Sequence, residues 1–235
     1  MNESSVSVRN LTKSFGNRKV VDDLSLDVRP GEVFALLGHN GAGKSTTIDL
    51  ILGLKMPDGG SARILGMNAA QNRKRVFERV DVQLQNTRYQ PNITVEEACI
   101  EYASLYAVPA DYPRLLDGFG LDALRKCFVS KLSGGERQRV YLDKKGNIYV
   151  LDELTTGLHA SDVQKVMALL DNLVDRGNTV IVIEHNLDVM KQADWLIDVG
   201  PDGGTAGGEI VFTGTPKEMA ERGNTITAEY LRKSL

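Results

Sequence analysis

The chain has 235 residues, of which 42% are hydrophobic and 25% charged, as expected for a globular protein with a sizeable core. A net charge of −3 and a pI of about 5.7 argue against a large duplex-DNA footprint, because such surfaces are strongly basic. The two cysteines, Cys99 and Cys127, form no CxxC pair, which argues against a zinc site and fits a reducing compartment.

The first ten residues, MNESSVSVRN, are polar and lack the features of a signal peptide. No apolar run approaches the roughly 20 residues that a membrane helix needs. We therefore expect a cytoplasmic protein that would reach a membrane only through a partner.

The N-terminal pattern predicts strands of two kinds. Residues 6–8 and 24–28 alternate apolar with polar side chains, which is typical of half-buried antiparallel strands. Residues 33–37, VFALL, are continuously apolar, as in a strand covered on both faces. A glycine-rich turn follows, and then a helix with Ile48, Ile51 and Leu52 on one face.

The middle of the chain is predicted to be helical to about residue 140. Thr94-Val95-Glu96-Glu97 is a capping box that opens a helix. The apolar stripe of that helix is Val95, Ala98, Tyr102, Leu105 and Tyr106.

The C-terminal part returns to buried strands at 148–151, 180–183 and 195–197, with a helix at 163–174. A parallel α/β core interrupted by a helical insertion follows from this order.

The strongest motif is GHNGAGKS, residues 38–45, which matches GxxxxGK[ST] between a buried strand and a helix. Glycines let the backbone wrap around phosphate, and successive N–H groups point inward as an anion nest. We expect Lys44 to reach the β- and γ-phosphates and the Ser45 hydroxyl to bind Mg²⁺.

Two carboxylates end the strand IYVLDE, residues 148–153. Asp152 is placed to hold Mg²⁺ through water, and Glu153 to polarise the attacking water. Such a pair alone would indicate only solvated acids at a strand end, but beside a phosphate loop it favours hydrolysis.

The third motif is LSGGE, residues 132–136. With GHNGAGKST and IYVLDE in this order, the chain resembles ABC-type ATPases over nearly its whole length. The resemblance implies a P-loop NTPase fold with a RecA-like parallel-sheet core, an antiparallel β subdomain and a helical insertion. It implies one ABC ATPase domain over 1–235, with its core at 1–85 and 147–235 and its helical subdomain at 86–146.

The resemblance also implies the roles of single residues. Phe15 resembles the aromatic residue that stacks on adenine, although a core phenylalanine is an equal alternative. Gln85 resembles the glutamine that senses Mg²⁺ and the attacking water, with Gln83 as the competing candidate. His185 resembles the switch histidine at the γ-phosphate.

The implied cofactors are ATP and Mg²⁺. The implied catalytic residues are Glu153, His185, Lys44 and Gln85, and the implied metal ligands are Ser45, Gln85 and Asp152. Thr155-Thr156-Gly157-Leu158 resembles the loop that crosses the dimer interface. The implied nucleotide-binding residues are Phe15, Gly38, His39, Asn40, Gly41, Ala42, Gly43, Lys44, Ser45 and Thr46, with Ser133, Gly134, Gly135 and Glu136 acting on the partner's ATP.

The two halves of the chain resemble different branches of the family. Residues 1 to about 135 are similar to the ATP-binding subunits of drug or ABC-2-type exporters. From about residue 147, TTGLH, VIVIEHNLDVMKQADWLIDVGPDGG and GGEIVFTGTP resemble the C-terminal ATPase region of the UvrA excinuclease, a bacterial DNA-damage sensor.

Two departures from the family pattern are expected to impair turnover. The span from Arg139 to Asp152 is 13 positions where exporters usually have about 17, so about one helical turn is missing. Leu154 stands where both branches usually have proline, which would stiffen the turn after Glu153.

The primary hypothesis is the ATP-hydrolysing subunit of an exporter, working as a head-to-tail dimer with a copy of itself or a homologous ATPase. Its partner would be a membrane permease on the inner face of the plasma membrane. The alternatives are a UvrA-like DNA-repair ATPase fragment, with direct DNA binding disfavoured, and a chimeric nucleotide-binding domain with weak or no turnover. The transported substrate cannot be read from the sequence.

Overall fold

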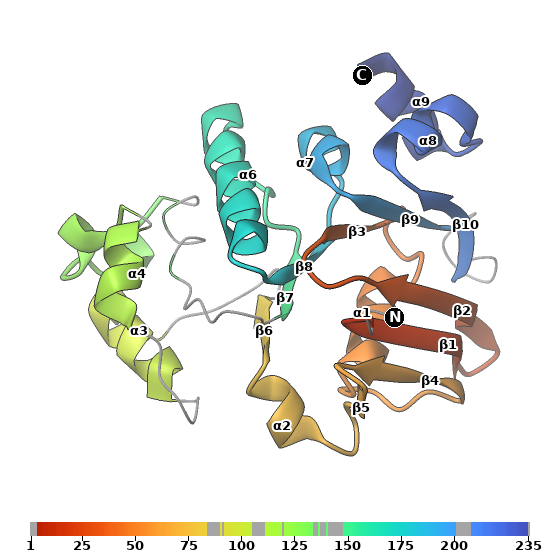
Figure 1. Cartoon of the computed structure of the whole chain (residues 1–235), viewed down its shortest axis with the longest axis horizontal. Coiled ribbons are helices and arrows are strands. Elements are labelled where there is room, and N and C mark those ends of the chain that lie inside the picture. The colour runs from red at the N-terminus through yellow and green to blue at the C-terminus, as the bar shows by residue number, and fades with distance from the viewer. Residues whose placement is uncertain are drawn as a thin grey trace.

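The computed structural model describes residues 4–83, 90, 92–104, 111–118, 120–133, 136, 140, 148–200 and 208–234. Its centre is a sheet in the order β10-β9-β3-β8-β7-β6 (Figure 1). All neighbouring pairs in this sheet are parallel except β10 with β9. The strands of this sheet are β3 (Val33–Leu37), β6 (Val80–Gln83), β7 (Ile148–Asp152), β8 (Thr179–Ile183), β9 (Trp195–Gly200) and β10 (Glu209–Gly214).

The central strands are buried on both faces because alternate side chains enter two different hydrophobic cores. Phe34 and Leu36 of β3 belong to one core, and Val33, Ala35 and Leu37 belong to the other. Since successive side chains of a strand point to opposite faces, a continuously apolar strand can serve both cores.

A second, antiparallel sheet has the order β2-β1-β4-β5. It packs against the central sheet through the core that also contains Ile48 and Ile51 of the first helix, α1. The strands of the second sheet are β1 (Val6–Phe15), β2 (Arg18–Val28), β4 (Gly59–Ile64) and β5 (Met67–Asn68).

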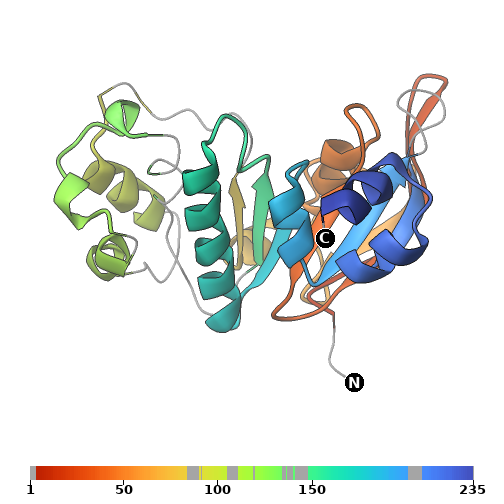
Figure 2. The same cartoon turned by 90° about the horizontal axis from the view of Figure 1, so that it is seen from above.

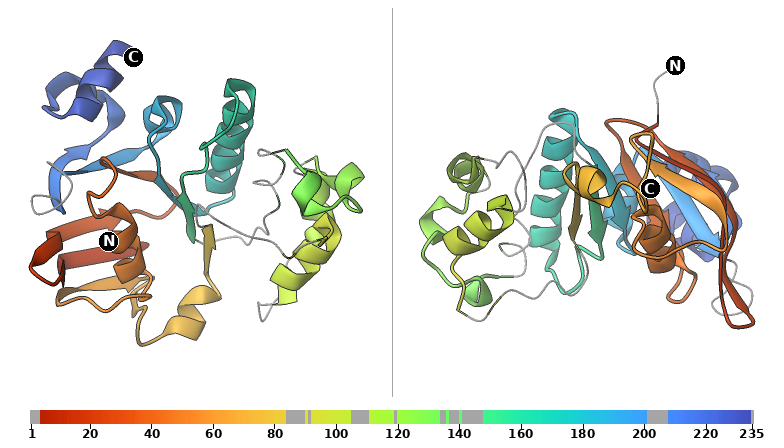
Figure 3. Two further views of the ribbon diagram at one scale, coloured as in Figure 1. Left: turned by 180° about the vertical axis from the view of Figure 1, so that it is seen from behind. Right: turned by 90° about the horizontal axis from the view of Figure 1, so that it is seen from below.

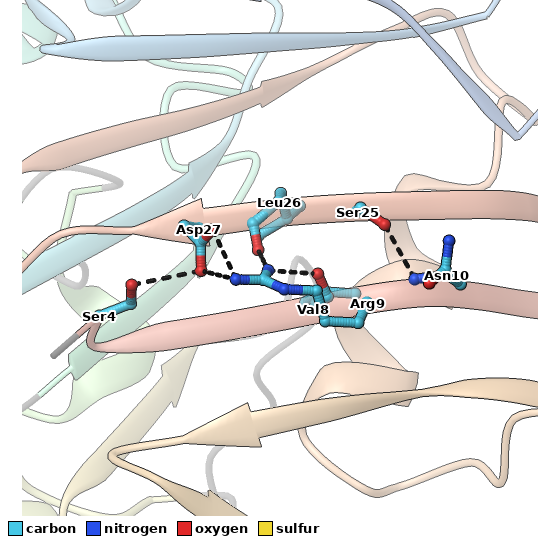
Figure 4. A network of polar contacts seen from close by, with 7 residues as sticks. All are labelled: Ser4, Val8, Arg9, Asn10, Ser25, Leu26 and Asp27. Atoms are coloured by element: carbon cyan, nitrogen blue, oxygen red, sulfur yellow. Dashed lines mark hydrogen bonds and ion pairs between the residues drawn. The ribbon is translucent and has the colours of Figure 1, made fainter.

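The outer face of β1 and β2 carries a polar network (Figure 4). Both oxygens of Asp27 accept 2.9 Å hydrogen bonds from Arg9, and Ser4 donates to the same carboxylate. The Arg9 and Asp27 side chains are 53% and 44% exposed, so their ion pair stabilises the fold by only about 0–1 kcal/mol.

The opposite face of the central sheet packs on the C-terminal helices. The long helix α6 contributes Val163, Val166 and Leu170 to the second core, and α9 contributes Leu231. The helices of these layers are α1 (Lys44–Ile51), α2 (Arg73–Phe77), α6 (Ala160–Asp175), α7 (Leu187–Gln192), α8 (Pro216–Arg222) and α9 (Ile226–Ser234).

The insertion between β6 and β7 has its own hydrophobic cluster, built only from residues between 93 and 140. It contains α3 (Val95–Ser104), α4 (Tyr112–Gly118) and the 3₁₀ turns η1 (Asp122–Leu124) and η2 (Val129–Lys131). Figures 1 and 2 show α3 and α4 at one end of the molecule and the antiparallel sheet at the other, with α6 between them. The two further views in Figure 3 show the same separation.

The structure confirms the predicted fold class: a parallel core sheet, an antiparallel sheet and a helical insertion. The capping box is also confirmed, since Thr94 accepts from Glu97 N at 3.2 Å while Glu97 accepts from Thr94 N at 2.8 Å. Leu105 and Tyr106 of the predicted stripe lie outside the described residues. None of the described helices is long and apolar enough to cross a membrane.

Candidate nucleotide site

The carboxyl ends of the parallel strands meet at one edge of the central sheet, where ligands of open α/β folds bind. Strand β3 ends at Leu37, directly before the glycine-rich loop. Strand β7 ends at Asp152, and β8 ends at Ile183, two residues before His185. Topology therefore brings together motifs that are more than 100 residues apart.

The glycines of the phosphate loop, residues 38–46, are required by its backbone. Gly38, Gly41 and Gly43 have φ values of 134°, 88° and 99°. A Cβ atom at Gly43 would collide with the carbonyl oxygen of Val20, and one at Gly38 with that of Val199. The loop can pass this close to its neighbours only without side chains.

Lys44 lies over the loop that it follows. Its Nζ donates to the carbonyl oxygens of Gly38 (2.6 Å) and His39 (3.1 Å). Burial lowers the pKa of Lys44, and the negative charges of Glu153, Asp152 and Asp198 partly oppose that shift. A buried ammonium that donates to carbonyl oxygens can turn to bind an incoming phosphate.

A cleft of about 300 Å³ opens beside this loop. Phe15 lies in its lining and is 48% exposed, which excludes the alternative of a core phenylalanine. The ammonium groups of Lys13 and Lys55 lie 5.7 and 5.8 Å from its ring centroid. The lining consists of Phe15, Arg18, Val20, Asn40, Gly41, Gly43, Lys44, Ser45, Thr46, Asp152, Glu153 and Ile183.

Both predicted acids therefore face the phosphate loop. Burial and the neighbouring charge of Glu153 raise the pKa of Asp152. Cationic charge near Asp152 would favour its ionised form. The exposed hydroxyl of Ser45 lines the same cleft. A hydroxyl and a carboxylate are hard oxygen donors of the kind that Mg²⁺ prefers, so these two residues fit the predicted ion.

Glu153 has a left-handed backbone, with φ of 50°. This conformation costs a non-glycine residue about 1–3 kcal/mol, and such strain tends to occur at functional sites. Its N–H donates to the carbonyl of Ile183 at 2.8 Å, and its Oε2 accepts from Thr156 Oγ1 at 3.2 Å. These bonds hold the carboxylate at the cleft.

His185 lies next to the phosphate loop but lines a second, larger pocket of about 630 Å³, together with Gly38 and His39. Desolvation and the charge of Lys44 lower the pKa of His185 below 6.5. His39 is exposed, and its Nδ1 lies 2.9 Å from the carbonyl oxygen of Asn40.

The described part of the LSGGE motif forms a capping box. Ser133 N and Oγ donate to Glu136 Oε2, both at 2.9 Å, and Glu136 N donates to Ser133 Oγ at 3.2 Å. Neither residue is in the described lining of the chain's own cleft. This placement is compatible with action on a second molecule's nucleotide.

Three predicted site residues, Gln85, Gly134 and Gly135, lie outside the described residues, as does most of the link from Arg139 to 147. The competing candidate Gln83 is 9% exposed at the end of β6. Its Oε1 is buried and has no hydrogen-bond partner in the described structure.

Sequence reasoning missed three polar residues at this edge. Arg18 lines the cleft and donates to the carbonyl of Gly41 at 3.2 Å. Glu184 and Asp198 are only 2% and 3% exposed. Both stand where an apolar strand pattern is broken by a carboxylate, and that break was the signal available in the sequence.

Known proteins resemble this chain in sequence and in fold. The family model described as "ABC transporter" matches residues 21–156, more than half of the chain. UvrABC system protein A of Aquifex aeolicus (strain VF5) is 55% identical over 111 residues, covering 44% of this chain. The protein of the same name from Staphylococcus aureus (strain N315) is 44% identical over 151 residues, covering 61%.

The chain spans only 12% and 16% of the lengths of these two relatives. Among solved structures, an ATP-binding subunit of an ABC transporter superposes with a TM-score of 0.79 at 22% identity, covering 99% of this chain and 100% of that one. CbiO1 from Clostridium perfringens, part of the ABC transporter complex cbiONQ, superposes with a TM-score of 0.78 at 24% identity, covering 94% and 92%. At sequence identities below 25%, these superpositions show that the fold is shared and nothing more.

Proposed function

The chain belongs to the ABC transporter family of ATP-hydrolysing domains, and from this premise we propose that it hydrolyses ATP between two copies packed head to tail. One observation carries the proposal. Lys44, Ser45, Asp152 and Glu153 all line a single cleft, and Phe15 lies in the same lining. Ser133 and Glu136 of the LSGGE motif are not in this described lining, which supports a role at a second molecule's nucleotide.

Binding follows from the loop geometry. The backbone N–H groups of residues 38–46 and the ammonium of Lys44 would hold the phosphates, and Phe15 would stack on the adenine. Ser45 and Asp152 would hold Mg²⁺, with Gln85 as a further ligand, and the ion would neutralise charge on the phosphates.

The chemistry falls to Glu153. Its carboxylate would orient a water molecule and accept its proton during in-line attack on the γ-phosphorus. A neutral His185 would contact the γ-phosphate through a ring N–H. Ser133 and the glycines at 134 and 135 of the second molecule would complete the site, so that closure of the dimer and hydrolysis are coupled.

We favour a role in DNA repair, in which the chain would be an ATPase region of a protein similar to UvrABC system protein A. The support is sequence identity of 44–55% to these relatives, against 21–24% for the transporter structures. In this setting the chain would pass ATP-driven motion to neighbouring DNA-reading parts, and its own surface, with net charge −3, would not bind DNA directly.

The second candidate is the exporter ATPase of our primary hypothesis, and the exporter-like first half of the sequence favours it. Helix α3 would then dock on a membrane permease, bringing the domain to the inner face of the plasma membrane. Ile100 on α3 is 49% exposed and is available for such a contact.

The deciding experiment compares ATP turnover of the parent chain with that of Glu153→Gln, while light scattering follows dimerisation in Mg·ATP. We expect Glu153→Gln to lose turnover and to accumulate as an ATP-bound dimer, because the amide cannot accept the water's proton. Equal turnover in both proteins would overturn the assignment of Glu153. A parent that binds ATP without turnover would support the alternative of a chimeric domain with weak or no turnover. Co-purification with UvrABC-type partners would support the DNA-repair role, and co-purification with a permease would support the exporter role.

A further inference from the structure

Glu184 joins the two loops that carry the predicted catalytic side chains. It follows β8 directly and is 2% exposed. Its Oε1 accepts from Thr155 N at 2.7 Å, and its Oε2 accepts from Thr155 Oγ1 at 2.9 Å. Oε2 also accepts from His185 N at 3.1 Å and, at the longer distance of 3.4 Å, from Asn186 N.

These donors come from two separate segments. Thr155 lies two residues after Glu153 in the turn that leaves β7. His185 and Asn186 begin the loop that leads into α7, where Asn186 caps the helix by accepting from Asp188 N. The carboxylate of Glu184 is therefore a buried bridge from the turn of Glu153 to the loop of His185.

The turn of Glu153 needs such a support. Its left-handed φ of 50° is unfavourable for glutamate and persists only where neighbouring bonds hold it. One bond is the donation from Glu153 N to Ile183 O, and Glu184 fixes the other side of the turn through Thr155.

We propose that Glu184 is a positioning residue that aligns Glu153 and His185 on the same γ-phosphate. The inference rests on the proposed function, since it assigns these two side chains to hydrolysis. Glu184 itself lines neither the cleft nor the larger pocket in the described structure, so it acts through the two loops.

A carboxylate suits this position because every bond to it comes from an N–H or O–H group. Glutamine has the same shape, but its amide nitrogen would face a donor in either orientation. The unsatisfied donor would be buried, and the turn or the loop would have to shift.

The test compares Glu184→Gln, Thr155→Val and Thr155→Ser in the full chain, with kcat, KM and ATP affinity measured for each. We expect kcat to fall on the order of 10–100-fold in the first two variants, because small displacements of catalytic groups have effects of that size. ATP affinity should stay at the parent value, and Thr155→Ser should retain kcat because it keeps the hydroxyl.

Glu218→Gln is the matched control. Glu218 also accepts from the backbone N–H and the hydroxyl of one threonine, Thr215, but at the start of α8. We expect it to lower thermal stability without changing kcat. If Glu184→Gln keeps the kcat of the parent, or if Thr155→Val changes only stability, the proposal is wrong.

A second measurement tests the positioning role of Glu184 independently of ATP turnover. In Thr155→Val the ring resonances of His185 in the NMR spectrum should shift, because Glu184 loses the hydrogen bond from Thr155 and also accepts from His185 N. In Glu218→Gln they should stay unchanged. Unmoved His185 resonances would overturn the proposal. A parent without ATP turnover would instead overturn the proposed function, and the NMR result would still decide the bridge.

Discussion

At the residue scale, burial disfavours the charged forms of the side chains on which the proposed site depends. It lowers the pKa values of Lys44 and His185 and raises that of Asp152, so each group is displaced toward its neutral form. The raised pKa of Asp152 means that its contribution to stability is present below 3.8 and is lost as pH rises through the folded value. In the nucleotide-free chain, ionised Asp152 is thus destabilising at neutral pH, and a bound cation would relieve that cost.

The lowered pKa of His185 gives a testable pH dependence. Its contribution to stability is present above 6.5 and is lost as pH falls through the lower folded value. If a neutral imidazole is needed, kcat should stay constant just below pH 6.5 and fall only at more acidic pH. We expect His185→Ala to have low kcat without this acidic limb, as measured by steady-state assays between about pH 5 and 8. His159→Ala, at the exposed start of α6, is the control and should keep the profile of the parent.

At the scale of elements, the turn between β7 and α6 is held by packing as well as by hydrogen bonds. Leu154 is 2% exposed and belongs to the core cluster that includes Val163 and Met167 of α6. In the sequence, Leu154 was notable only because both branches of the family usually have proline at this position. Its burial gives it a second role, since it anchors the turn to the helix.

These two roles make Leu154→Pro informative. Proline fixes φ, so we expect turnover to rise, while loss of the buried leucine should lower the melting temperature. Both are measured on the same preparation, by ATPase assay and by thermal unfolding. Leu170→Ala, which is 1% exposed in the same core, should cost about 2–5 kcal/mol of stability without raising turnover. If Leu154→Pro leaves kcat unchanged, packing already holds the turn and stiffness does not limit the rate.

At the scale of the whole molecule, the proposed site is incomplete in one copy. The cleft contains Lys44 and Glu153, whereas Ser133 lies in the part of the chain whose hydrophobic cluster is separate from both cores of the central sheet. A two-fold head-to-tail dimer would supply each cleft with the LSGGE motif of the other copy.

Mixing two inactive variants tests this arrangement. Lys44→Ala should not bind phosphate, and Ser133→Ala should not close the partner's site, so each alone should have little turnover. In a mixed dimer, one of the two sites has both intact residues, and we expect turnover to return in part when the proteins are combined. If the mixture remains as inactive as the separate variants, the two residues do not act on one nucleotide from different copies.

The local patterns of the sequence determined the elements and the main motifs of this protein. Continuous apolar runs predicted the buried strands of the central sheet, and the capping box predicted the start of α3. The glycines of the phosphate loop could be assigned from spacing alone, because their positive φ values are a local requirement.

The tertiary structure alone decided which side chains share a site and how their charges are balanced. Phe15 could be read as a core or a surface residue until the fold placed it in the cleft, 48% exposed. Glu184 and Asp198 were not recognised, because each sits within or beside an apolar strand and only the parallel pairing of β7, β8, β3 and β9 brings them to the phosphate loop. The physical reason is that burial, hydrogen bonding and charge interaction depend on neighbours distant in the chain, which periodicity and spacing do not encode.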